Sequence, residues 1–96
     1  MILTERETNE GLLVTVCDAD ILGETFEEDG VTIDVTEEFY GGDAATTDAV
    51  TDALTRASVA NLVGTHTVEF AIEEGFVDEN VVLDVDGTRH AQLLAV

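Results

Sequence analysis

The residues of this chain that could carry out chemistry are few. Cys17 and Asp18 stand where an apolar run ends, and His66 and His90 are the only imidazoles. A cysteine nucleophile needs a base that helps it to form the thiolate, whereas neighbouring carboxylates raise the pKa of a thiol. The pattern therefore favours Cys17 as a small buried side chain. An enzyme with a pocket made of Cys17, Asp18 and His90, of unknown substrate, is the alternative.

Neither a metal site nor a cofactor is predicted. One cysteine and two histidines, without C-x-x-C or H-x-x-x-H spacing, do not make a zinc site. Asp18, Asp20, Gly23 and Asp29 match four positions of a calcium-binding loop, but Leu22 replaces a ligand and the bidentate Glu is missing. Such partial matches arise by chance in an acid-rich chain. The absence of lysine excludes Schiff-base chemistry.

Residues suited to binding are easier to find. Phe39 and Tyr40 are adjacent aromatic residues, and the glycines Gly41 and Gly42 that follow them permit close backbone approach. Tyr40 could stack on a base or a peptide over this glycine platform. Phe39 is expected to fill the core, while the glycines turn the chain into the next helix.

Asn61 and His90 are the other polar residues of interest. Asn61 interrupts an apolar run and needs a hydrogen-bond partner if it is buried. His90 falls on an apolar face in the hairpin register derived below. Each has an ordinary structural explanation, a tied loop for Asn61 and a core histidine for His90, but together they could line a pocket.

The charge is the most unusual property of the chain. Its 22 acidic residues face three arginines and no lysine, which gives a formal net charge of −19. Such self-repulsion destabilises a compact state in dilute buffer, but the Debye length falls to roughly 3 Å at 1 M salt. Because the acids spread over the whole chain, we interpret them as adaptation to the high-salt cytoplasm of a halophilic archaeon. An acidic partner of a basic protein, or a nucleic-acid mimic, is the alternative.

Length and hydropathy predict one globular domain over residues 1–96. Hydrophobic residues make up 45% of the chain, enough to form a core. No apolar run approaches the roughly 20 residues of a membrane span, the start does not resemble a signal peptide, and a single cysteine cannot form an internal disulfide. We therefore expect a cytoplasmic protein without a membrane contact.

The predicted elements give an α+β fold. Residues 2–7 and 12–17 read as a strand pair, and residues 31–35 as a half-buried strand. A helix that begins at Thr46 is expected to continue to a stop at Gly64. A second, shorter helix follows from Thr65 and ends at Gly75, and Thr65 can cap its start.

A hairpin closes the chain. Asp86-Gly87 is a favoured two-residue turn, and its register pairs Asp84 with Arg89 and Leu83 with His90. The order is therefore β-β-β-α-α-β-β, with two helices on one face of a mostly antiparallel sheet of about five strands.

Several short blocks together resemble the archaeal domain of unknown function 424 family. In chain order they are Val16-Cys17-Asp18, Leu22-Gly23, Phe26, Phe39-Tyr40-Gly41-Gly42, Ala60-Asn61-Leu62-Val63-Gly64 and Gly87-Thr88-Arg89-His90-Ala91-Gln92. The resemblance implies a small archaeal cytoplasmic protein, without an established activity, that is loosely connected with translation or RNA metabolism. It adds Cys17 and Asp18 to Tyr40, Gly41, Gly42, Asn61 and His90 as candidate binding residues. The lysine-free surface departs from any basic contact site that relatives use.

The hypothesis from the sequence is therefore a non-catalytic binding or adaptor protein. Its expected partner is RNA or a protein associated with the ribosome or translation. The contact surface is expected to run over Tyr40-Gly41-Gly42 and over the polar end near Asn61 and His90. If Tyr40 is buried, the stacking surface is lost. If Cys17 is buried and distant from His90, the enzyme alternative loses its site.

Overall fold

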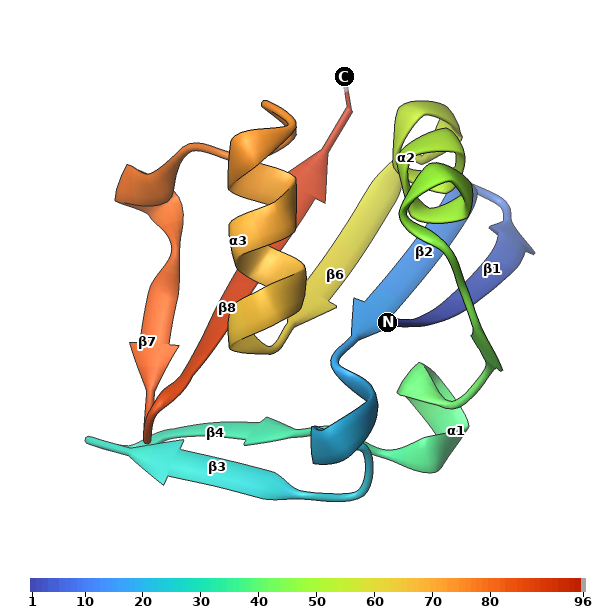
Figure 1. The fold of residues 1–96 in the computed structure, drawn as a ribbon. Helices are drawn as coiled ribbons and strands as arrows, with labels where there is room; N and C mark the ends of the chain where they lie inside the picture. Colours follow the sequence, from blue (N-terminus) through green and yellow to red (C-terminus); the bar gives the residue numbers. More distant parts are fainter. Residues whose placement is uncertain (96) are drawn as a thin grey trace.

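The computed structural model describes residues 1–95 and has one mixed sheet, a separate hairpin and three α-helices (Figure 1). The order of the six strands in the sheet is β5-β1-β2-β6-β8-β7. These strands are β1 (Ile2–Thr8), β2 (Gly11–Cys17), β5 (Asp43–Ala44), β6 (Val59–Val63), β7 (Leu83–Val85) and β8 (Thr88–Leu94). The hairpin consists of β3 (Thr25–Glu28) and β4 (Val31–Asp34). The helices are α1 (Glu37–Tyr40), α2 (Thr47–Arg56) and α3 (Thr65–Glu73), with short 3₁₀ turns η1 (Ala19–Ile21) and η2 (Glu79–Val81).

Both predicted hairpins of the main sheet are confirmed. β1 and β2 pair antiparallel over their full length. β7 and β8 pair in the predicted register, with Leu83 opposite His90 and Asp84 opposite Arg89. Asp86 and Gly87 form the turn with φ angles of +48° and +84°, as a type I′ turn requires. The strand before this turn begins at Leu83, because the preceding residues form η2.

The long helix predicted from Thr46 to Gly64 is wrong in its second half. Thr46 does cap α2, since its hydroxyl accepts the Ala49 N–H at 3.2 Å, but the helix ends at Arg56. Residues 59–63 form β6, which lies at the centre of the sheet and pairs parallel with β2. The apolar run of this segment fits a helix stripe and a buried strand equally well. Residues 59–63 form a strand because they lie between β2 and β8 and pair with both.

Helices α2 and α3 cover the same face of the sheet, as predicted (Figure 1). Alternate residues of β2 and β6, among them Val14, Val16 and Leu62, pack against them and are fully buried. The sheet is wider than expected and mixed, because β2 and β6 run parallel and β5 adds an edge strand. The coarse α+β class with helices on one face therefore holds, whereas the strand count and order differ.

The opposite face of the sheet, here called the far face, is covered only in part. Figure 1 shows the β3–β4 hairpin across the end of the sheet where the β7–β8 turn lies. A second apolar cluster forms there, and it includes Cys17, Ile33, Val35, Val63 and Val85. Along the strands away from this end, the far face has side chains that stay accessible. Among residues 1–95, no helix has the length and hydropathy needed to cross a membrane.

Candidate binding surface on the far face of the sheet

The far face is a grid of three rows set by strand register. The row at the hairpin end contains Ile2, Cys17, Val63, His90 and Leu83 on five neighbouring strands. The middle row contains Thr4, Thr15, Asn61 and Gln92, and the third row contains Arg6, Leu13, Val59 and Leu94. Side chains on β8 are more exposed than those of the same row on β2. In the middle row, Thr15 is fully buried and Gln92 is exposed; in the third row, Leu13 is half-buried and Leu94 is exposed.

Six accessible residues of this grid form what we call the open face. They are Leu13, Val59, Asn61, His90, Gln92 and Leu94. Leu94 is 61% exposed, and Leu83, which lies opposite His90 on β7, is 44% exposed. The other apolar members are half-buried, so a partner that covers this surface removes apolar area from water.

Asn61 and His90, which the sequence suggested could line a pocket together, lie near each other on the open face of the sheet. Asn61 is directly opposite Gln92, and His90 is opposite Val63, the second residue after Asn61. The two side chains are therefore diagonal neighbours on adjacent strands. Burial lowers the pKa of His90, so its imidazole is neutral at pH 7. The pair offers an amide and a neutral imidazole, both suited to directional hydrogen bonds.

Carboxylates are absent from the strand positions of the far face. Among the described residues, the acids of the six-stranded sheet fall on the helix-covered side, where Glu5, Glu7, Asp43 and Asp84 alternate with far-face residues. The far face has only Arg6 and His90 as titratable side chains other than the buried Cys17. In a chain with 22 acidic residues, this separation distinguishes the far face from the rest of the surface.

The expectation that Tyr40 presents its ring to solvent is wrong. Tyr40 is only 5% exposed, and Phe39 is the more accessible of the two residues. Their rings meet edge to face at 5.0 Å between centroids. Burial, followed by the nearby Cys17, raises the pKa of the Tyr40 hydroxyl to about 12. Both rings therefore belong to the second apolar cluster: α1 turns Tyr40 into it, and Phe39 packs against it while partly buried, close to its expected role.

Gly41 allows the chain to pass close to the first residue of α1, and Gly42 allows it to pass close to β1. A Cβ at Gly41 would overlap the carbonyl of Glu37, and a Cβ at Gly42 would overlap the carbonyl of Leu3. The Thr4 hydroxyl donates to the Gly41 carbonyl at 2.8 Å. These glycines allow the close approach that the sequence predicted, but the groups approached belong to the protein itself, to α1 for Gly41 and to β1 for Gly42.

Cys17 and Asp18 do not form a pocket with His90. Cys17 is fully buried, and burial, followed by the charge of Asp18, raises the pKa of its thiol to about 11. Val63 lies between Cys17 and His90 in the strand register, which separates their backbones by two strand spacings, roughly 10 Å. The thiol is therefore neither accessible nor activated.

The Asp18 carboxylate caps helix α3. Its Oδ1 accepts the Thr67 N–H at 2.8 Å and the Thr67 hydroxyl at 2.7 Å, and its Oδ2 accepts the His66 N–H at 3.1 Å. Thr65, the predicted cap, is instead the first residue of the helix. A Cβ at Gly64 would overlap the Asp18 carboxylate. Asp18 thus has a structural role.

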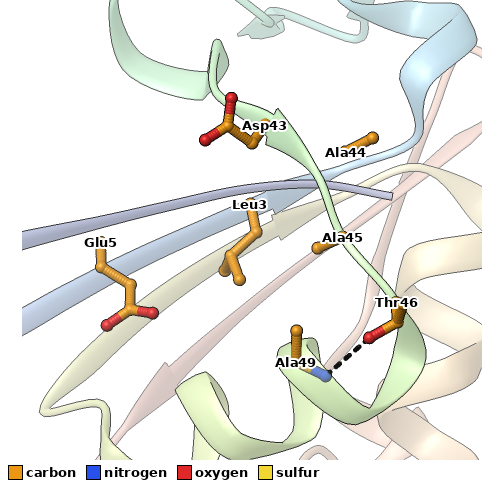
Figure 2. Close-up of a pocket in the computed structure, with 7 residues that line it drawn as sticks. All are labelled: Leu3, Glu5, Asp43, Ala44, Ala45, Thr46 and Ala49. Atoms are coloured by element: carbon orange, nitrogen blue, oxygen red, sulfur yellow. Dashed lines mark hydrogen bonds between the residues drawn. The ribbon is translucent and has the colours of Figure 1, made fainter.

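A hollow of about 470 Å³ lies elsewhere, on the helix-covered side (Figure 2). Its wall consists of Leu3, small side chains of the 44–49 segment, and the carboxylates of Glu5 and Asp43. Glu5 is paired with Arg56 at 2.9 Å, and Figure 2 shows the Thr46 hydroxyl used as the cap of α2. Two of the polar residues of this hollow, Glu5 and Thr46, therefore already have partners within the fold.

A second hollow adjoins the open face. It has a volume of about 290 Å³ and is lined by the β1–β2 turn, by Leu13 and by Ser58 and Val59. Sequence reasoning missed Leu13, Val59, Gln92 and Leu94 as surface residues. In the sequence, these residues occupy every second position of neighbouring strands, and no acidic residue occurs among those positions. This pattern could have identified them, but only once residues 59–63 are recognised as the strand β6.

Comparisons with known proteins agree with this fold. The model of the family described as "Protein of unknown function (DUF424)" matches residues 5–96. An uncharacterized conserved protein from Methanopyrus kandleri has a crystal structure that is similar with a TM-score of 0.78 and 21% sequence identity, over 99% of this chain and 93% of that one. No curated protein sequence matches the chain. Because the family model spans almost every residue, the chain belongs to the DUF424 family.

Proposed function

We propose that the chain is a non-catalytic binding module that holds a macromolecular partner on the open face of its sheet. The observation that carries this proposal is the separation of charge. The far-face strand positions have no carboxylate, while the described helices, turns and hairpin around them are acidic. Apolar and amide groups left accessible in this setting are typical of an interface.

The partner that we propose is a component of the archaeal translation or RNA-processing machinery. The support is the resemblance to the DUF424 family, whose connection with translation or RNA metabolism is a loose one. The structural neighbour is itself an uncharacterized protein, so it supports the fold and not the partner.

The acid-rich surface suits work in concentrated salt, and we propose a high-salt cytoplasm as its setting. At 1 M salt the Debye length is roughly 3 Å, so long-range attraction contributes little to association. Apolar burial and short-range hydrogen bonds persist under these conditions. The open face offers these two kinds of contact through Leu94 and Asn61.

The burial of Cys17 and the capping role of Asp18 support a non-catalytic function. Of the three residues that the enzyme alternative needs, Cys17 is fully buried and Asp18 is engaged by the first turn of α3. His90 alone has no nucleophile beside it in the register of the far face. Binding is therefore the function that the geometry favours.

Co-purification from cells at their native salt concentration tests the proposal. The tagged wild-type chain is compared with Leu94→Glu, which places a charge on the open face, and with Val81→Glu. Val81 is the matched control because it is 66% exposed and lies in η2, outside the open face. We expect a specific partner to be recovered with the wild type and with Val81→Glu but not with Leu94→Glu. Equal recovery with all three chains contradicts the proposal.

A further inference from the structure

We infer that the occupant of the open face is a protein segment with an apolar centre and basic flanks, and not RNA. This inference rests on the proposed binding function and specifies the partner's chemistry. Three observations carry it: the engagement of every arginine within the fold, the composition of the open face, and the acidic segments that border it.

All three arginines are already occupied. Arg6 donates to the carbonyls of Phe39 at 3.0 Å and Glu38 at 2.6 Å. On the opposite side of the sheet, Arg56 is paired with Glu5 and Asp52, and Arg89 with Asp84 and Glu79. Binding to nucleic acid draws its affinity from cations that replace the counterions of phosphates. The described strand positions of the far face include one arginine, Arg6, and its guanidinium already donates to carbonyls of α1. The far face therefore does not supply cations for phosphates.

The open face provides only one ring, that of the half-buried His90, for the stacking that single-stranded RNA uses. Its other members are aliphatic and amide side chains, whereas binding of successive bases relies on several aromatic or arginine planes. Phe39, a half-buried aromatic residue of α1, has the Arg6 guanidinium over its ring at 5.4 Å. This composition matches the apolar centre of a protein interface more closely.

The hollow beside Leu13 and Val59 provides a place for one apolar side chain of the partner. Its volume of about 290 Å³ exceeds that of a leucine or phenylalanine side chain, and it opens next to the third row of the grid. Gly11 contributes to its shape, because a Cβ there would overlap Ser58. Buried apolar anchors in such pockets dominate the energetics of many interfaces.

The segments at the border of the open face are acidic. Helix α1, held to the far face through the Phe39 carbonyl, has Glu37 and Glu38 on its exposed side. The β3–β4 hairpin adds the exposed Glu27 and Glu28. A neutral centre with a negative border complements a partner with lysine or arginine at its flanks. A second copy of this chain would instead bring two acidic borders together.

Titration of the 96-residue chain with defined probes, monitored by amide NMR in ~1 M KCl, tests the inference. The probes are an 18-residue peptide of leucine and lysine, a serine–lysine peptide of equal charge, a leucine–glutamate peptide and an oligouridine. We expect the leucine–lysine peptide alone to shift the amides of the open-face residues. The Leu94→Glu and Gln92→Glu variants should weaken this binding about tenfold or more, and Val81→Glu should leave it unchanged.

Several results overturn the inference. Equal shifts with the serine–lysine peptide reveal attraction by charge alone, and stronger shifts with oligouridine identify RNA as the occupant. Concentration-dependent shifts of the same amides without a probe identify a second copy. If co-purification still depends on Leu94 in these cases, the proposed function stands and only the class of partner is wrong. If the leucine–lysine peptide binds but co-purification does not depend on Leu94, the proposed function fails separately.

Discussion

The carboxylate of Asp18 binds Thr67 through two hydrogen bonds, one from the backbone N–H at 2.8 Å and one from the hydroxyl at 2.7 Å. These contacts join the end of β2 to the first turn of α3 across 48 or more residues of chain. A carboxylate at this position satisfies N–H groups that the helix leaves unpaired and interacts favourably with its dipole. The start of α3 is therefore fixed by a residue far away in the sequence.

Replacement of Asp18 by alanine should destabilise the fold. The loss of a helix cap costs about 1–2 kcal/mol, and the Thr67 hydroxyl loses its acceptor as well. Chemical denaturation of Asp18→Ala measures this loss, and Asp20→Ala is the control because Asp20 is exposed in η1. If both variants unfold at the same denaturant concentration, the cap does not contribute to stability.

Cys17 should resist alkylation as long as the protein is folded. Its side chain has no exposed surface, and the raised pKa of about 11 leaves almost no thiolate at pH 8. Mass spectrometry after iodoacetamide treatment should show no label without denaturant and one label after unfolding. A Cys17→Ala, Val81→Cys variant, whose thiol is exposed, should be labelled without denaturant. Rapid labelling of Cys17 in the folded state would restore the enzyme alternative.

The sequence predicts those parts of the fold that local patterns decide. The turn residues Asp86 and Gly87 set the register that places His90 on the far face. Gly75, with a φ of +81°, ends α3 in a motif in which the Phe76 N–H donates to the Ala71 carbonyl at 2.9 Å, as its position predicts.

Long-range contacts account for what the sequence did not reveal. Residues 59–63 have an apolar pattern that fits both a helix and a strand, and only their position between β2 and β8 selects the strand. The burial of Tyr40 depends on where α1 packs, which no local pattern specifies. The pairing of Asn61 and His90 as neighbours was anticipated as a pocket, but the extended surface around them depends on the strand order.

The stability of the protein should depend on pH through His90. Burial lowers the pKa of His90 in the folded state, so below the ordinary value of about 6.5 the unfolded chain binds a proton that the folded chain does not. The contribution is fully present above that ordinary value and is lost as the pH falls from it through the lower pKa of the folded state. Between pH 7.5 and 5.5, His90→Gln should therefore lose less free energy of unfolding than the wild type. The exposed His66 provides the control, and a His66→Gln variant that matches His90→Gln contradicts the assignment.

Salt should stabilise the fold strongly. A net charge of −19 creates self-repulsion within the folded chain. Because concentrated electrolyte screens this repulsion, the midpoint of thermal unfolding should rise between ~0.1 M and ~3 M KCl. A variant with Glu10, Asp20, Glu24 and Glu73 changed to amides should show a shallower rise, because these exposed residues contribute to the repulsion. Equal stability in dilute buffer and in concentrated KCl contradicts the proposed high-salt setting.

Arg6 should stabilise the position of α1 on the far face. The helix has only four residues, far fewer than an isolated helix needs, and its last carbonyls accept hydrogen bonds from Arg6 and Thr15. Arg6→Gln should cost about 1–2 kcal/mol, the range for one or two lost hydrogen bonds, and should increase amide hydrogen exchange in residues 37–41. Arg56→Gln removes exposed ion pairs and should change stability much less. If exchange in α1 is the same in both variants, Arg6 does not hold the helix, and its guanidinium becomes available to a partner.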